Sequence, residues 1–296
     1  MRTREFVRYA DVTIEVIVEG QGPAIVLLPS LARDSEDYDA VAEGLAAAGY
    51  RALRPQPRGI GESTGPLTGI SLHDFARDIA EVIKALGGGK AVIAGHAYGN
   101  WIARMTAVDY PALVRGVVVL AAAAKQFPPK LLTAINVAGN PALPKQQRLE
   151  ALRFAFFAPG NDPSGWLEGW HPHMRESQRA AAAAVKQSDW WSAGVAPLLD
   201  LQAESDPFKP PEKRNEMKDE FGDRVTVAIV PGASHALIPE SRQPSWKRWS
   251  PGLKRCRDAV PRYSGVRAFA APRNDSDLRR VCRRRSPVLA SRRGTR

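Results

Sequence analysis

The sequence has few cysteines and no long apolar run. Its 296 residues include only two cysteines, Cys256 and Cys282, both near the carboxyl end. Two cysteines there support neither a disulfide framework nor a zinc site. No run of eighteen apolar residues occurs, and the amino-terminal residues contain no apolar core of the signal-peptide type. We therefore expect a cytoplasmic protein with no membrane segment.

Acidic residues are scarce at the carboxyl end. Residues 241–296 hold 17 Lys and Arg against 3 Asp and Glu, whereas residues 1–240 hold 25 against 28. The net charge of +11 therefore belongs to this tail. Without an aromatic or groove-reading pattern beside it, nucleic-acid binding is not expected. The tail is rich in Arg, Ser and Pro and lacks a regular helical or strand period, which indicates disorder. Two alternatives are a foreign sequence read out of frame and a basic arm that binds nucleic acid.

The apolar pattern predicts an α/β fold. Continuous apolar runs such as 91–95 are typical of strands buried on both faces, and apolar residues in 72–86 fall on one helical face. Strands and helices alternate, which predicts a mostly parallel central sheet with helices on both faces. The predicted strands are 12–18, 23–29, 50–54, 91–95, 116–123, 197–203 and 224–230, and the predicted helices are 35–48, 72–86, 99–109 and 211–221.

The alternation stops between residues 125 and 194, where the pattern is helical. We interpret 125–194 as an inserted helical cap on a core formed by 1–124 and 195–240, although a simple extension of the helical layer would give the same pattern. Four tryptophans in this stretch either line an apolar substrate pocket or anchor the cap to the core. They are Trp166, Trp170, Trp190 and Trp191.

Three features that carry chemistry each follow a predicted strand. Gly95-His96-Ala97-Tyr98-Gly99 stands between a buried strand and a helix, and its glycines permit a sharp turn that exposes the middle residue. Asp206 follows the strand at 197–203, and His235 follows the strand at 224–230. Side chains at the carboxyl ends of parallel strands face a common crevice. The order elbow, acid, histidine is that of a hydrolytic triad.

On these features the chain, from about residue 5 to 240, resembles the α/β-hydrolase superfamily. Further segments share the resemblance: Leu27-Leu28-Pro29-Ser30-Leu31, Arg58-Gly59-Ile60-Gly61-Glu62-Ser63 and Tyr110-Pro111-Ala112-Leu113-Val114. The resemblance implies that Asp206 is the acid, that His235 is the base, and that the backbone N–H groups of Leu31 and Tyr98 form an oxyanion hole. It also implies a serine at position 97, where this chain has alanine.

Other departures accompany Ala97. Pro29-Ser30 stands where the family has His-Gly in the oxyanion loop. The hole uses backbone N–H groups, so this change of side chains does not remove its donors. The final helix expected after His235 has no clear counterpart in the sequence. Ala97 is either a natural loss or an introduced replacement. Ser30 and Tyr98 offer hydroxyls near the crevice, but neither occupies the tip of the elbow.

A methyl group cannot attack a carbonyl, so the acyl-enzyme route is closed at Ala97. The leading hypothesis is hydrolysis of a small, apolar, ester-like or related carbonyl substrate by water, which a dyad of His235 and Asp206 activates. The alternatives are a catalytically silent ligand-binding protein and a non-hydrolytic enzyme that removes a substrate proton. No cofactor and no metal are expected, because the pair His171-Pro172-His173 lacks a third ligand. The oligomeric state stays open.

Overall fold

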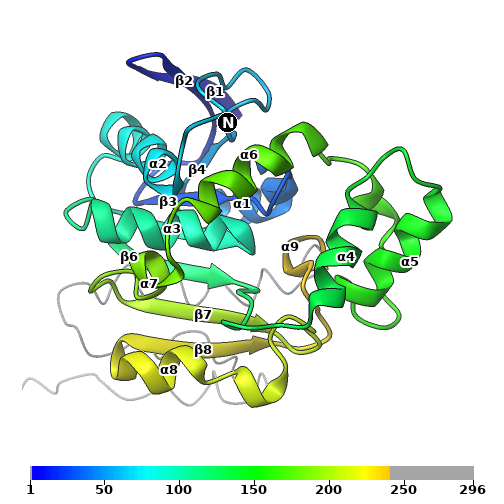
Figure 1. Ribbon diagram of the computed structural model, residues 1–296. Helices are drawn as coiled ribbons and strands as arrows, with labels where there is room; N and C mark the ends of the chain where they lie inside the picture. The colour runs from blue at the N-terminus through cyan, green and yellow to red at the C-terminus, as the bar shows by residue number, and fades with distance from the viewer. Residues whose placement is uncertain (1, 241–296) are drawn as a thin grey trace, which may run out of the picture.

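The centre of the protein is an eight-stranded sheet, seen in a computed structural model that describes residues 2–240 (Figure 1). The strand order is β1-β2-β4-β3-β5-β6-β7-β8. Strands β1 and β2, and β2 and β4, pair antiparallel, and all the other pairs are parallel. The strands are β1 (Arg2–Tyr9), β2 (Val12–Glu19), β3 (Ala24–Leu28), β4 (Arg51–Pro55), β5 (Ala91–His96), β6 (Val114–Leu120), β7 (Leu198–Ala203) and β8 (Val225–Val230). The predicted α/β class and mostly parallel sheet are confirmed.

Helices cover both faces of the sheet. Helices α2 (Leu72–Leu86) and α3 (Tyr98–Asp109) pack on one face, where Phe75 and Ala103 belong to the larger apolar core. Helices α1 (Asp39–Ala47) and α9 (Leu237–Glu240) pack on the other, where Val41 and Leu237 belong to a second core. Helix α8 (Glu216–Phe221) lies beside β8. None of the helices within residues 2–240 is long and apolar enough to cross a membrane.

Some predicted elements differ from those observed. Strand β1 was not predicted, because it is an edge strand in which charged residues alternate and only Val7 is buried. Strand β6 ends at Leu120 rather than at residue 123, because Ala121 has a positive φ of 46° and turns the chain. The predicted helices 35–48 and 211–221 each begin with a short 3-10 turn, η1 (Ser35–Tyr38) and η3 (Pro211–Lys213).

The chain between β6 and β7 is helical, as its pattern predicts. It contains α4 (Pro129–Ala138), α5 (Lys145–Ala155), η2 (Ser164–Leu167), α6 (Pro172–Ala183) and α7 (Gln187–Trp191). Helices α4 and α5 lie beyond the carboxyl ends of the strands (Figure 1). A third apolar core joins this inserted segment to the strand-end loops through Trp166 and Phe208, whereas Trp190 of α7 packs in the larger core of the sheet. The division at residues 124 and 194 stays a prediction.

The basic tail, residues 241–296, lies outside the described residues together with Cys256 and Cys282. Its interpretations as a disordered or a foreign segment therefore stay predictions. The four-residue helix α9 stands where the sequence showed no clear helix after His235.

Candidate active site

The elbow is a sharp turn from β5 into α3 with Ala97 at its tip. Ala97 has φ 47° and ψ −111°, a backbone conformation that L-residues rarely adopt. A Cβ on Gly95 would lie 2.3 Å from the carbonyl oxygen of Gly99, and a Cβ on Gly99 would lie 2.5 Å from the carbonyl oxygens of Leu28 and Pro29. Only glycine at both flanks allows the turn and the close approach of the loop after β3.

Gly99→Ala is therefore expected to lower the free energy of unfolding by about 1–3 kcal/mol, because backbone atoms cannot move aside cheaply. Chemical denaturation of both proteins measures this change. Gly165→Ala in η2 is the matched control, since a Cβ there meets nothing within 4 Å and should change stability by less than about 1 kcal/mol. Equal losses in the two variants would contradict the close approach.

The acid and the histidine meet at the ends of neighbouring strands. Asp206 follows β7 and His235 follows β8, and the His235 Nδ1 lies 3.1 and 3.0 Å from the two carboxylate oxygens of Asp206. Asp206 Oδ1 also accepts a hydrogen bond from the Phe208 N–H at 2.9 Å. Both side chains are buried, 4% and 5% exposed as residues. The His235 ring packs against the Phe208 ring, with centroids 4.0 Å apart. This arrangement fixes the proton of His235 on Nδ1 and leaves Nε2 with no hydrogen bond inside the described part of the chain.

His96 connects the elbow to the histidine loop. Its Nε2 lies 2.7 Å from the carbonyl oxygen of His235, so Nε2–H donates and the carbonyl accepts. Burial, assisted by the nearby His235, lowers the pKa of His96 to about 3. The imidazole is therefore neutral at neutral pH, and its one proton lies on Nε2, where the carbonyl accepts it. The ring centroids of His96 and His235 are 6.0 Å apart, which places the dyad beside the elbow.

The two predicted oxyanion donors lie on neighbouring segments at this end of the sheet. Leu31 lies in the turn after β3, and Tyr98 is the first residue of α3. The first N–H groups of a helix have no acceptor within it. The contact of Gly99 with the carbonyls of Leu28 and Pro29 brings the two segments together. Their function as oxyanion donors stays a proposal.

The four predicted pocket tryptophans fall into two separate groups. Trp166 lies near the site, with its ring 6.2 Å from that of His96 and 5.6 Å from that of Trp170. Trp190 instead stacks on Trp101 of α3 at 5.1 Å, and the indole N–H of Trp191 donates to Glu220 at 2.7 Å. The structure therefore brings Trp166 beside His96, packs Trp170 on Trp166, and places Trp190 and Trp191 against the helical layer of the sheet.

Sequence reasoning missed two residues of the site. Phe208 covers the His235 ring, and its place two residues after Asp206 was the signal that could have found it. Gln178 of α6 is 2% exposed and accepts a hydrogen bond from the backbone N–H of Ala32 at 2.7 Å. No sequence signal indicates this contact, because the two residues are 146 positions apart.

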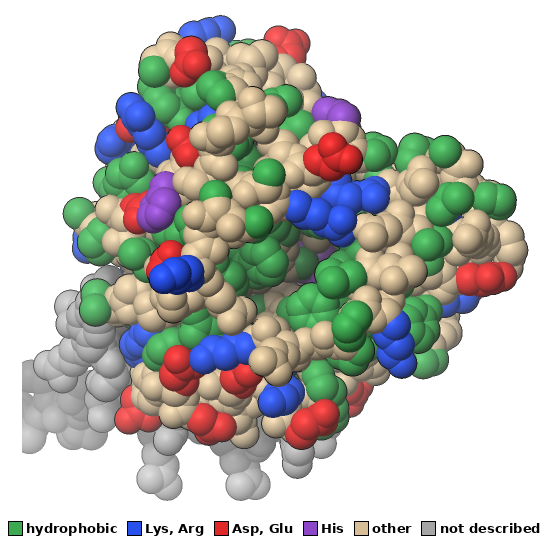
Figure 2. Space-filling model, viewed as in Figure 1, with side chains coloured by type: hydrophobic (Ala, Val, Ile, Leu, Met, Phe, Trp, Pro, Cys, Tyr) green, Lys and Arg blue, Asp and Glu red, His purple; other side chains and the backbone are tan. Residues whose placement is uncertain are grey.

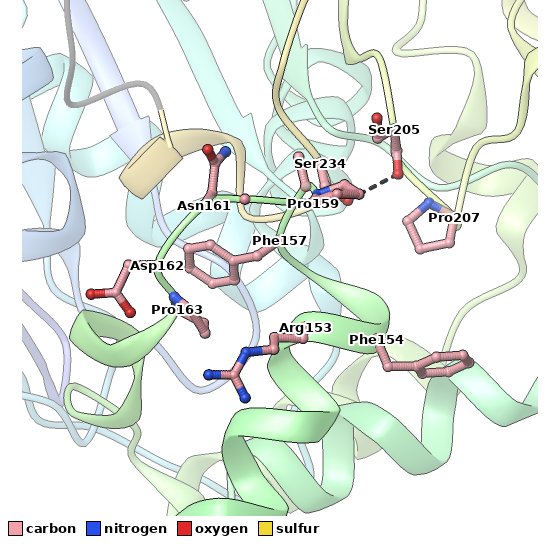
Figure 3. Close-up of a pocket in the computed structure, with 12 residues that line it drawn as sticks. Arg153, Phe154, Phe157, Pro159, Asn161, Asp162, Pro163, Ser205, Pro207 and Ser234 are labelled. Carbon is pink, nitrogen blue, oxygen red and sulfur yellow. Dashed lines mark hydrogen bonds between the residues drawn. The ribbon is translucent and has the colours of Figure 1, made fainter.

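Hydrophobic side chains gather in a hollow between the inserted helices and the sheet domain (Figure 2). A separate cavity of about 550 Å³ lies between the acid and histidine loops and residues 153–163, at the end of α5 and after it (Figure 3). Ser205, Pro207 and Ser234 line it, but neither Asp206 nor His235 does. It therefore borders the dyad without giving access to it.

Within residues 2–240, no three His, Cys, Asp or Glu side chains gather as metal ligands would. The two histidines of the His-Pro-His segment contact other groups. His171 Nε2 lies 3.0 Å from the Asp34 carboxylate, and His173 Nε2 lies 3.0 Å from the carbonyl oxygen of Gly59.

Comparison with known proteins identifies the family to which this fold belongs. A model of the alpha/beta hydrolase family matches residues 25–245, and the chain belongs to this family. Over 109 residues it is 31% identical to 2-(acetamidomethylene)succinate hydrolase from Mesorhizobium japonicum, a match that covers 37% of this chain and 39% of the relative. Over 104 residues it is 30% identical to a soluble epoxide hydrolase from Corynebacterium sp. (35% and 36%). The matches thus span less than half the length of these relatives.

Among solved structures, an esterase from Exiguobacterium antarcticum is similar with a TM-score of 0.69 and 19% identity, covering 83% of this chain and 98% of the esterase. A thermophilic esterase from Thermogutta terrifontis is similar with a TM-score of 0.66 and 22% identity, covering 87% and 98%. At such identities the likeness shows a shared fold and no more.

Proposed function

We propose that the protein hydrolyses a small, apolar, ester-like or related carbonyl substrate with water as the nucleophile. The observation that carries this proposal is the buried pair of His235 and Asp206 beside an elbow whose tip, Ala97, has no nucleophile. The relatives are named as hydrolases, which supports the reaction class. Their names cover different bonds, so the substrate is argued from the site alone.

The proposed reaction needs one base and two donors. His235 Nε2 takes a proton from water while the oxygen attacks the carbonyl carbon, and Asp206 stabilises the imidazolium that forms. The carbonyl π electrons move to oxygen, where the N–H groups of Leu31 and Tyr98 stabilise the oxyanion. The tetrahedral intermediate then collapses, its C–O bond to the leaving group breaks, and the imidazolium returns the proton to that group. No acyl-enzyme forms.

His235→Ala is expected to lower turnover of short-chain nitrophenyl esters by about 10²-fold or more, because it removes the proposed general base. Release of nitrophenolate measures it. His73→Ala is the matched control: His73 also pairs with a carboxylate, Asp109 at 2.7 Å, but it is exposed and distant in the fold, so its loss should leave turnover unchanged. Turnover that persists in His235→Ala would contradict the proposal.

Ala97 also favours a second candidate, a ligand-binding protein without catalysis on the same fold. The same panel separates the two functions. A binding protein would show no turnover in the unmodified chain, and its ligand affinity would tolerate the loss of His235.

A further inference from the structure

Gln178 lies on the inserted helix α6 and bonds to both segments that carry the proposed oxyanion donors. Its side-chain Oε1 accepts a hydrogen bond from the Ala32 N–H at 2.7 Å, directly after Leu31. Its backbone carbonyl accepts a hydrogen bond from the Tyr98 hydroxyl at 2.8 Å. Gln178 is 2% exposed, so water does not compete for these bonds.

Ala32 stands in a conformation that alanine rarely adopts, with φ 55°. Such a turn persists only where its surroundings hold it. The Ala32 N–H donates to Gln178, and the Ala32 carbonyl accepts from the His171 N–H at 2.8 Å. The loop itself adds one bond, from the Arg33 N–H to the Ser30 carbonyl at 3.2 Å. Both polar backbone groups of Ala32 are therefore held by the inserted segment and not by β3.

The hydrogen bond to Ala32 also determines how the Gln178 carboxamide is oriented. The Ala32 N–H is a donor, so the oxygen of the carboxamide faces it. Glutamate would keep an acceptor at this position, whereas methionine has a similar length and offers only a weak one. The bond from Tyr98 goes to the backbone and is kept with any side chain. Substitution at position 178 therefore isolates the bond to Ala32.

We propose that Gln178 is a positioning residue for the oxyanion hole, which fixes the turn at Ala32 and thereby the direction of the Leu31 N–H. This inference rests on the proposed function, because the hole acts only in carbonyl chemistry. A donor that points away from the developing oxyanion weakens transition-state stabilisation and leaves ground-state binding largely unchanged. The inserted helix α6 therefore sets the rate of the chemical step in addition to any contact with substrate.

Amide hydrogen exchange at Ala32, resolved by NMR, tests the link independently of activity. In Gln178→Met we expect exchange at Ala32 to become about tenfold faster or more, since the N–H loses its acceptor. Gln178→Glu keeps an acceptor and, under conditions where it remains folded, should exchange more slowly at Ala32 than Gln178→Met. Ser177→Ala is the matched control on the same helix: its hydroxyl bonds to the Leu67 carbonyl at 2.7 Å and not to the oxyanion loop. Unchanged exchange at Ala32 in Gln178→Met overturns the proposal.

Kinetics of nitrophenyl ester hydrolysis test the consequence. We expect Gln178→Met to lower kcat about tenfold or more with KM nearly unchanged, Gln178→Glu to recover most of kcat, and Ser177→Ala to change neither. Faster exchange with an unchanged kcat, or a rise in KM alone, overturns the positioning role. If the unmodified protein shows no turnover, the proposed water-using hydrolase fails by itself, and the exchange rate at Ala32 alone decides whether Gln178 holds the loop.

Discussion

Ala97→Ser is expected to raise ester hydrolysis by about 10²-fold or more over the unmodified protein. Loss of the serine in a serine protease lowers kcat by about 10⁶. The remaining groups still accelerate the reaction by about 10³–10⁴ over the rate in water. The reverse change here starts from a site in which the backbone at position 97 already has the strained geometry of a nucleophile elbow. A serine needs only to add its hydroxyl to the Cβ that is present.

The mechanism should change together with the rate. With a serine at position 97, His235 would take the proton of the hydroxyl, an acyl-enzyme would form, and water would then release it. We expect a burst of nitrophenolate equal to the amount of enzyme, and a covalent adduct with a fluorophosphonate detected by intact-protein mass spectrometry. The unmodified chain should show neither.

Two variants make this test decisive. Ala97→Ser combined with His235→Ala should lose the burst, because the new hydroxyl then has no base. Ala97→Ser alone should unfold at nearly the same denaturant concentration as the unmodified protein, since the side chain grows by one atom at a tip that is only partly buried. A folded Ala97→Ser protein that neither accelerates nor forms an adduct would show that position 97 is not opposite the His235 base.

The sequence predicts the sheet well where burial imposes a pattern. Strand β3 is buried along its length and β5 at every residue except the partly buried Val92, and the sequence shows both as continuous apolar runs. Strand β1 was not predicted because it lies at the edge of the sheet, where alternate charged residues remain in water. Charged residues such as Arg2 and Arg4 therefore obscure the apolar alternation typical of a strand. The pattern is thus most informative where the strand has neighbours on both sides and helices on both faces.

The dyad was also predictable, and for a similar reason. Asp206 and His235 each follow a parallel strand, and the carboxyl ends of such strands meet at one edge. The contacts of the insertion were not predictable. Trp166 lies near His96 and Trp190 packs on α3, although both belong to one tryptophan-rich stretch. How helices of an insertion dock depends on tertiary packing, which neither spacing nor composition encodes.

Lys209→Met is expected to lower the free energy of unfolding by about 3–5 kcal/mol at neutral pH, because it leaves a buried carboxylate without its partner. The Lys209 Nζ lies 2.7 Å from Asp200 Oδ2, and the two side chains are 1% and 0% exposed. Gln202 donates one further hydrogen bond to that oxygen at 2.7 Å. The other carboxylate oxygen, Oδ1, has no partner within the described residues. Denaturation in urea measures the loss.

The loss should depend on pH in a defined direction. Burial raises the pKa of Asp200, and the Lys209 ammonium opposes this rise. Without Lys209 the pKa in the folded state rises further above the unfolded value of about 3.9. A group with a raised folded pKa favours folding when protonated and loses that contribution as pH rises. The difference between Lys209→Met and the unmodified protein should therefore be smaller at about pH 4 than at about pH 7.

Two controls separate this effect from the loss of any lysine. Lys218→Met removes an exposed pair with Asp223 at 3.0 Å and should cost no more than about 1 kcal/mol. Asp200→Leu combined with Lys209→Met removes both charges and should regain most of the stability. A loss that is the same at both pH values, or that persists in the double variant, would contradict the assignment to the buried charge.

Lys209→Met should also lower the activity of the site, because the loop that carries Asp206 continues to Lys209. The Lys209 N–H donates to the Asp206 carbonyl at 3.1 Å, and Phe208 between them packs on His235. Without its anchor on Asp200 the loop gains freedom, and the carboxylate of Asp206 then holds His235 less well. Under conditions where Lys209→Met remains folded, we expect slower ester hydrolysis than in the unmodified protein, measured as kcat. Full activity in a destabilised Lys209→Met would mean that the dyad is held by Phe208 and the strand ends alone.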